Sequence, residues 1–480
     1  MSFQLKSLSL AVATLSAIST VHAAGLDRST QPSWAFTQDG TFAYVEHITI
    51  SPDVAGKDNK NVATPESNYA EGKNTGNMTE DYQFLNFGAK ADINDRVSVG
   101  AFFDQPLGAD VQYNGDNNFV AKDANTTIQD ITANKFTNIK TADQTLQNLT
   151  NTIKDFTGKA LQETDPIKKA NLNETIKNLS KQAENLGLAI KSGLTNQSNI
   201  GQGTNVKITS QNFTGMVGVK LGENKNIQVY GGPTIQKLEG DVHLRGIAYS
   251  GATGYDASMS PDTAYGWMAG VAYSKPEIAL KAALTYRSEI KHDTRMAEHL
   301  PLAAAASGGK IAIDETSNIT VEIPRSVNLD FQTGLNPTTL LTAKLRWVPW
   351  SDFAITPKNY NALSKLKVPA GTPLVSYDKD SWSGEVGLGK KLNSKWALSG
   401  SVGYDTGAGN PVTSLGPVEG NWNVGLGAKY NLTPEWAISG GAKYLMFGDA
   451  KAKLPTGDIV GDFKDNDGWV YGVRLSYQKK

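Results

Sequence analysis

The strongest constraint on the fold is a two-residue alternation that returns five times in the last hundred residues. In each run, apolar and aromatic residues alternate with small, polar or charged ones; the runs are residues 381–390, 396–405, 421–430, 436–446 and 469–477. A period of two places successive side chains on opposite faces, which is typical of β-strands. A run of about ten residues crosses a bilayer when tilted. With aromatic residues at the strand ends, this pattern indicates an all-β membrane protein, a transmembrane β-barrel.

Composition narrows the function classes without deciding the fold, because a water-soluble β-sandwich has a similar composition. The formal net charge of −1 gives no indication of nucleic-acid binding. The chain has no cysteine, which excludes disulfides, thiolate metal ligands and cysteine nucleophiles. This is compatible with an oxidising compartment.

The N-terminus has the features of a secretory signal peptide. Lys6 precedes an apolar stretch at residues 8–18, and Val21-His22-Ala23 supplies small residues at −3 and −1. We predict cleavage after Ala23, so that residues 1–23 are removed and the mature protein reaches the outer membrane. Residues 24–40 then form a short N-terminal hatch segment.

The remainder, residues 41–478, is predicted to form one antiparallel barrel of about 14 strands. Short turns alternate strictly with longer connections, such as Lys237 to Pro261 and Thr294 to Ser317. Bacterial barrels place short turns in the periplasm and long loops outside. Both termini are therefore expected on the periplasmic side.

An insertion at residues 123–197 interrupts the strand pattern after the third strand. Leucine and isoleucine recur there at helical spacing in two stretches, separated by Asp165-Pro166. We predict two amphipathic helices packed on each other on the extracellular side. A disordered loop is the alternative.

Several short sequence motifs in the strands resemble those of the FadL/TodX (OMPP1) family of outer-membrane transporters for long-chain fatty acids and hydrocarbons. They are residues 50–54, 283–291, 321–324, 347–351 and 379–380, in the family's order. The resemblance implies a 14-stranded barrel with an N-terminal hatch and uptake of hydrophobic molecules. Two features depart from the pattern: residues 24–41 lack the hatch's Asn-Pro-Ala phrase, and Tyr477 is followed by three further residues.

Catalysis is not expected, since none of the five histidines sits in a recognisable triad or metal-ligand phrase. No cofactor and no metal are predicted. Charges in phase with the lumen face are candidates for holding a fatty-acid carboxylate, namely Arg287, Arg346 and Lys379. The resemblance places a ligand-contacting lysine at the Lys379-Asp380 step. The alternative is that lumen charges pair with one another.

A second candidate site is the apolar run from Leu300 to Ala306 in an outer loop. Leu300 and Leu302 could form an exposed groove that captures ligand, because exposed apolar patches usually mark interactions. The alternative is that they pack against the helical insertion.

We therefore expect passive outer-membrane transport of hydrophobic small molecules, most specifically long-chain fatty acids, captured at the loops and passed through the lumen. The alternatives are a general porin, or an adhesin or structural barrel that uses the helical insertion. The expected partners are the hydrophobic ligand, outer-membrane lipids and lipopolysaccharide. The protein is expected to be a monomer that does not bind nucleic acid.

Overall fold

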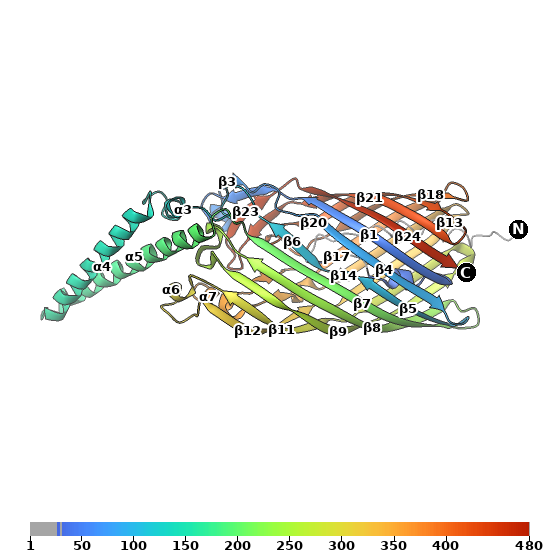
Figure 1. The fold of residues 1–480 in the computed structure, drawn as a ribbon, viewed down its shortest axis with the longest axis horizontal. Helices are drawn as coiled ribbons and strands as arrows, with labels where there is room; N and C mark the ends of the chain where they lie inside the picture. The colour runs from blue at the N-terminus through green and yellow to red at the C-terminus, as the bar shows by residue number, and fades with distance from the viewer. Residues whose placement is uncertain (1–25, 29–30, 480) are drawn as a thin grey trace.

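The computed structural model describes residues 26–28 and 31–479, which form a closed antiparallel barrel of 14 strands (Figure 1). β1 pairs with both β4 and β24, which closes the sheet. Three barrel strands are each interrupted and consist of two segments. In chain order the strands are β1 (Thr41–Asp53), β4 (Tyr82–Asp92), β5 (Val97–Asp104) with β6 (Gly108–Gln112), β7 (Asn205–Leu221), β8 (Ile227–His243), β9 (Asp256–Lys275), β10 (Leu280–Arg287) with β11 (Ile290–His299), β12 (Asp314–Ile323) with β13 (Ser326–Asn336), β14 (Thr339–Val348), β17 (Ser381–Lys391), β18 (Trp396–Asp405), β20 (Glu419–Asn431), β21 (Trp436–Gly448) and β24 (Asp467–Lys479).

The predicted faces of the C-terminal strands are confirmed. In β20, Trp422 and Val424 are exposed on the outer wall, whereas Asn421 and Asn423 are buried in the lumen. Aromatic pairs join neighbouring strands near both ends of this wall. Ring centroids are 4.6 Å apart for Tyr404–Trp422, 5.0 Å for Tyr444–Trp469, 4.8 Å for Trp396–Tyr430 and 5.1 Å for Trp436–Tyr477. Two aromatic belts of this kind mark the membrane interfaces of a barrel.

One side of the barrel is taller than the sequence pattern predicted. β8 continues to His243 and β9 begins at Asp256, inside the stretch that was expected to be a loop. Likewise β11 and β12 occupy much of the expected connection from Thr294 to Ser317. The prediction failed because the apolar face changes sides: Leu238 is buried inside while the neighbouring Lys237 is exposed outside. Strand segments above the membrane pack on the loops and face water outward.

The two predicted helices are present in the insertion between β6 and β7. They are α4 (Ile139–Gln162) and α5 (Pro166–Ser198), preceded by the shorter α3 (Ala124–Ile131). Asp165 caps α5 by accepting hydrogen bonds from the backbone N–H groups of residues 167 and 168, and Pro166 occupies its first turn. Figure 1 shows α4 and α5 as a rod that extends beyond the end of the barrel opposite to the one where β24 ends.

Loops fill the same end of the barrel with an apolar core. Trp350, Phe353, Tyr113 and Phe463 are almost completely buried there. Five loop strands form a small sheet: β2 (Gly56–Asn59), β3 (Glu71–Asn74), β19 (Val412–Thr413), β22 (Ala450–Lys453) and β23 (Ile459–Phe463). The other loop elements are β15 (Ala354–Ile355), which pairs with β16 (Val375–Ser376), and the short helices α6 (Ala303–Ala306) and α7 (Lys358–Ser364), which contact each other.

The N-terminal segment lies inside the barrel. Residues 31–37 are buried, and residues 33–36 form the short helix α2 (Ser33–Phe36). Trp34 contacts Tyr44 of β1 with ring centroids 5.0 Å apart, and Phe36 contacts Tyr230 of β8 at 5.6 Å. Aromatic contacts to two distant strands hold this segment across the lumen. The predicted signal peptide, residues 1–23, lies outside the described residues.

Among residues 26–28 and 31–479, no helix is both long enough and apolar enough to cross a membrane.

Candidate functional site

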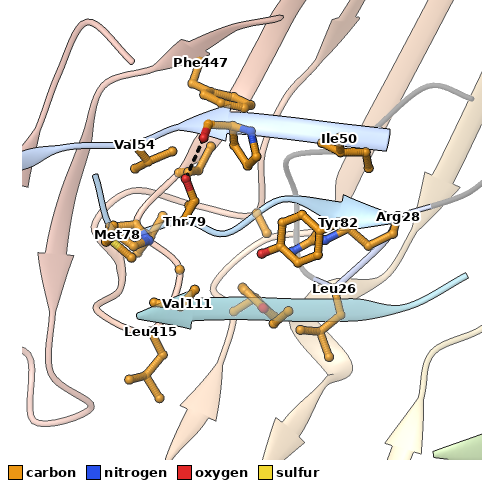
Figure 2. Close-up of a pocket in the computed structure, with 18 residues that line it drawn as sticks. Leu26, Arg28, Ile50, Val54, Met78, Thr79, Tyr82, Val111, Leu415 and Phe447 are labelled. Carbon is orange, nitrogen blue, oxygen red and sulfur yellow. Dashed lines mark hydrogen bonds between the residues drawn. The ribbon is translucent and has the colours of Figure 1, made fainter. Parts of the chain in front are cut away.

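An apolar pocket lies between the barrel wall and the loops, with about 830 Å³ of empty space including the part open to solvent. Its walls come from the end of β1, the start of β4, β6, and the loop that precedes β20 (Figure 2). Most lining side chains are aliphatic or aromatic, as a site for a hydrophobic ligand requires. They include Leu26, Ile50, Val54, Met78, Tyr82, Ala109, Val111, Val412, Leu415, Val418 and Phe447.

Arg28 brings a cation into this pocket from the N-terminal segment. Its guanidinium lies 5.2 Å from the centre of the Tyr82 ring, and its Nη1 donates to the backbone oxygen of Asp27 at 2.8 Å. Its Nε is buried without a hydrogen-bond partner, and no carboxylate of the described residues forms an ion pair with it. A buried donor without a partner is costly, so a ligand anion would be stabilised here.

Tyr377 lines the same pocket from the loop before β17. Burial raises the pKa of its hydroxyl to about 12, so the group stays protonated at neutral pH. The pocket therefore combines a guanidinium and a neutral phenol with apolar walls. This arrangement suits a molecule with a long apolar body and one acidic or polar end.

The barrel wall is incomplete beside the pocket. β4 pairs with β5 only from Phe87 onward, and β6 pairs with β7 but not with β4. Side chains close the gap: the backbone N–H of Leu85 donates to Gln105 Oε1 at 3.0 Å, and the Tyr82 hydroxyl contacts the backbone of Asp110. Pro106, which has no N–H, lies at the break. Because Tyr82 and Ala109 flank the gap and line the pocket, pocket and gap adjoin.

Two of the three predicted lumen cations come together in a different cavity. Arg287 and Arg346 line about 310 Å³ of empty space, including the part open to solvent, together with Asp27. Arg346 Nη2 donates to Asp27 Oδ2 at 2.9 Å and Nε to the same oxygen at 3.1 Å. Arg287 is 6% exposed, and Asp104 supplies the attractive charge beside it. Asp27 thus occupies the position at Arg346 that a ligand carboxylate was predicted to take. We name Asp27, Asp104, Arg287 and Arg346 the lumen charge cluster.

The predicted position of Lys379 in the lumen is wrong. Its side chain is exposed, and residues 378–379 form a bend before β17 begins at Ser381. Its backbone N–H donates to the Ala408 carbonyl at 3.0 Å. The alternation from Ser381 to Glu385 does not extend backward through the bend, so Lys379 does not share the buried face of Ser383.

The predicted exposure of Leu300 and Leu302 is also wrong, since they are 0% and 2% exposed. Leu300 belongs to the apolar core of the loops. Leu302 lines the floor of a wide groove beside α5, together with Leu188 and Ile247. The core that buries Leu300 contains no residue of the helical insertion, so the predicted packing against the insertion is not observed for it. The groove has about 1920 Å³ of empty space, including the part open to solvent.

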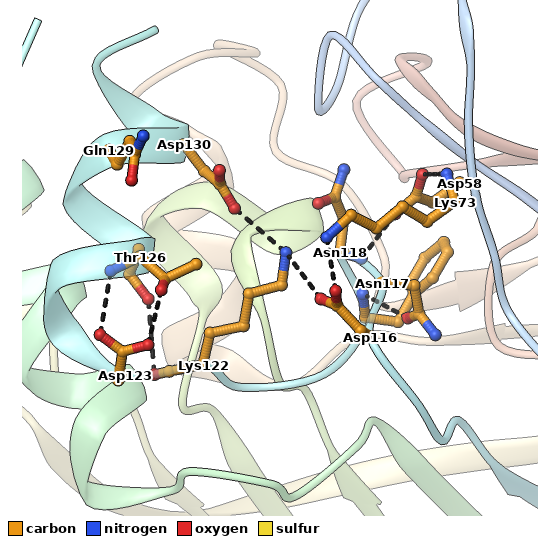
Figure 3. A network of polar contacts seen from close by, with 12 residues as sticks. Asp58, Lys73, Asp116, Asn117, Asn118, Lys122, Asp123, Thr126, Gln129 and Asp130 are labelled. Atoms are coloured by element: carbon orange, nitrogen blue, oxygen red, sulfur yellow. Dashed lines mark hydrogen bonds and ion pairs between the residues drawn. The ribbon is translucent and has the colours of Figure 1, made fainter. Parts of the chain in front are cut away.

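The rim of this groove is polar (Figure 3). Lys122 Nζ lies 3.0 Å from Asp130 and 3.5 Å from Asp116, and Lys73 pairs with Asp116 at 2.6 Å. The hydrogen bond from Lys73 holds the pKa of Asp116 below its usual range. These ion pairs connect α3 to the loop that contains β3. They fix the base of the helical rod over the groove.

Sequence reasoning did not single out Asp27 or Arg28 as functional residues, because neither belongs to a periodic run. Among the described residues, no group of three or more His, Asp or Glu side chains is arranged to hold a metal ion.

A family model described as outer membrane protein transport protein (OMPP1/FadL/TodX) matches residues 176–478, more than half of the chain. Among solved structures, a Pseudomonas aeruginosa FadL homologue is similar with 15% identity and a TM-score of 0.60, covering 93% of this chain and 92% of that one. The Pseudomonas putida toluene transporter TodX has 10% identity and a TM-score of 0.51, covering 97% and 94%. The Ralstonia pickettii toluene transporter TbuX has 10% identity and a TM-score of 0.51, covering 97% and 98%. None of the curated proteins matches.

Proposed function

Because the chain belongs to the outer membrane protein transport family (OMPP1/FadL/TodX), whose members carry hydrophobic compounds across the outer membrane, we propose that it takes up long-chain fatty acids by passive transport. Arg28 carries this proposal: an arginine in an apolar pocket that has no carboxylate partner among the described residues favours an acid over a plain hydrocarbon. The apolar walls bind the chain by removing it from water, and the guanidinium offsets the desolvation of the head group.

The proposed route begins at the outer loops. The groove beside α5 offers the half-buried Leu188 to an apolar chain, above the buried Ile247 and Leu302. The pocket holds the ligand next, with its carboxylate at Arg28. The gap between β4 and β6 adjoins the pocket, so release through the wall into the membrane requires only that side chains such as Tyr82 move aside.

Fatty-acid binding tests the proposal. The assay measures displacement of a fluorescent fatty acid from purified, folded protein. Arg28→Gln should weaken the free energy of fatty-acid binding by about 1.5–3 kcal/mol, the range for a hydrogen bond to a charged group. The alcohol of the same chain length should bind almost unchanged. Arg28→Lys should retain part of the affinity, since it keeps the charge but loses the planar geometry.

Arg295→Gln is the matched control, because Arg295 is exposed on the outer face of β11, away from the pocket. If the acid and the alcohol lose affinity equally in Arg28→Gln, the arginine acts through structure rather than charge. If wild-type protein binds the hydrocarbon but not the acid, the fatty-acid assignment is wrong.

The helical rod favours a second candidate function, attachment to a partner. Leu161 and Ile167 flank its distal turn and are 78% and 74% exposed. Deleting residues 125–196 should abolish attachment and spare fatty-acid uptake. A deletion variant that loses uptake while remaining folded would connect the insertion to transport.

A further inference from the structure

A chain of polar side chains connects β9 to the lumen charge cluster. His292 of β11 lies at its centre with 0% exposure. Its Nδ1 lies 2.9 Å from Asp262 Oδ2, and its Nε2 lies 3.1 Å from the side-chain amide of Gln236. The amides of Gln236 and Asn212 are 2.8 Å apart, and Asn212 contacts Arg287. The chain therefore joins a buried histidine to an arginine of the cluster.

Two directions of hydrogen bonding are open to these side chains. In the first, Gln236 directs its oxygen to His292 Nε2 and its nitrogen to Asn212. Asn212 Nδ2 then comes within 3.5 Å of Asp104 Oδ2, but it also faces the Arg287 guanidinium, and both of these groups are donors. In the second direction both amides are turned. The Asn212 oxygen accepts from Arg287 Nη1 at 3.1 Å, and its nitrogen faces Gln236.

The charge of His292 decides between the two directions. The ionised Asp262 carboxylate only accepts, so the ring donates to it from Nδ1. In the first direction Nε2 has to donate as well, to the Gln236 oxygen, and only a protonated ring has both protons. In the second direction Gln236 presents its nitrogen, and Nε2 of a neutral ring accepts from it. Every contact from Arg287 to Asp262 then joins one donor to one acceptor, as buried polar groups require.

The two directions give Asn212 different partners at the lumen charge cluster. With a neutral ring, its amide oxygen accepts from Arg287. With a protonated ring, its amide nitrogen turns to Asp104, whose Oδ1 has no hydrogen-bond partner among the described residues. The guanidinium then faces a donor and loses this contact. Asp104 is the last residue of β5, so the change ends beside the gap in the barrel wall.

We propose that His292, Gln236 and Asn212 form a pH-sensitive relay, in which protonation of the ring reverses both amides and releases Arg287 from Asn212. Histidine suits this role because its charge changes between about pH 5 and 8 when its surroundings do not perturb it. Acid thereby changes which groups hold an arginine of the lumen charge cluster. The relay does not depend on the proposed fatty-acid function.

The groups around the ring allow it to take up a proton. Asp262 contacts it from β9, and its side chain is 25% exposed, which connects the ring to solvent. Asp293, the next residue of β11, adds a second negative charge. β8 presents the uncharged Gln236, and β12 places Val321 opposite His292. The nearest cation along the chain, Arg287, is separated from the ring by two amides.

Nitrogen NMR of isotope-labelled histidine in the purified, folded protein reads the ring directly, because the two tautomers and the protonated form give different signals. Glutamine variants of His22, His47, His243 and His299 assign the remaining signals to His292. At neutral pH we expect a proton on Nδ1 and none on Nε2. On acidification Nε2 should gain a proton. A neutral ring with its proton on Nε2 would overturn the relay.

Arg287 should follow the same titration. Side-chain signals of isotope-labelled arginine, assigned with Arg287→Lys, should shift with the midpoint measured for His292. Gln236→Met interrupts the relay, keeps a similar volume and leaves every charge in place, so the shift at that midpoint should be lost. Gln228→Met, at the opposite end of β8, is the matched control and should retain the shift. A shift that persists in Gln236→Met would mean that Arg287 responds to another group.

Asn212→Asp tests the direction of the amides independently. An aspartate at this position only accepts, so the Gln236 nitrogen turns toward it and the Gln236 oxygen turns toward His292. This favours the protonated ring and should raise the midpoint of the His292 titration by about one pH unit. Adding Gln236→Met should remove most of that rise. A rise of the same size in the double variant would show that only the added charge acts, and the relay would be wrong.

Discussion

The apolar pocket and the lumen charge cluster share one stretch of chain, but they differ in whether a carboxylate of the protein pairs with the arginine. Asp27 extends into the cluster and binds Arg346, while the next residue, Arg28, extends into the pocket, where no carboxylate of the described part of the chain pairs with it. In the cluster, Asp27 binds Arg346, and Asp104 supplies a negative charge beside Arg287. The comparison shows that a cation in a barrel lumen marks an anion site only where the protein leaves it unpaired.

The largest expected effect is the loss of stability when the Asp27–Arg346 ion pair is broken. Asp27→Asn leaves the part-buried Arg346 guanidinium against a neutral amide, which should destabilise the protein by somewhat less than the about 3–5 kcal/mol of a fully buried pair. Unfolding in denaturant, followed by the gel-mobility shift between folded and unfolded barrel, measures the loss. The double variant Asp27→Leu/Arg346→Leu removes both charges and should recover most of the stability. Equal stability of Asp27→Asn and the wild type would show that the pair is solvated.

A smaller effect, on ligand affinity, is expected when an apolar side chain of the pocket wall is shortened. Leu415 lines the pocket and is 7% exposed, so Leu415→Ala removes contacts with the ligand chain. We expect the acid and the matched alcohol to lose about 1–2 kcal/mol each, because both bury the same apolar area. The displacement assay described for Arg28→Gln provides the measurement. A loss confined to the acid would contradict a purely apolar role for Leu415.

Alternation in the sequence predicted the barrel because lipid and lumen impose opposite polarity on successive residues, as Val424 and Asn423 illustrate. The rule fails where lipid no longer faces the wall. Leu238 and Lys237 keep alternating above the membrane, but with the apolar side chain directed inward. The predicted loop boundaries were therefore wrong although the strands were recognisable.

The site was less predictable than the wall, because its residues meet through contacts that span the chain. Asp27 and Arg346 are far apart in sequence, and nothing local in either segment indicates their pairing. Leu300 has the composition of an exposed apolar patch, but loop packing buries it completely. Which residues meet inside the barrel depends on which segment crosses the lumen. A two-residue period in the strands does not indicate which segment that is.

The smallest effect is expected at Lys379, the residue that alternation and family resemblance favoured as the carboxylate ligand. Its side chain is exposed in a bend, where the ammonium is solvated and contributes little to binding or stability. Lys379→Ala should therefore change fatty-acid affinity by less than about 0.5 kcal/mol, the usual range for surface substitutions. The displacement assay with Arg28→Gln in parallel gives the contrast directly. A loss at Lys379 as large as that at Arg28 would mean that the head group binds at the loop rim, and the unpaired arginine in the pocket would lose its assigned role.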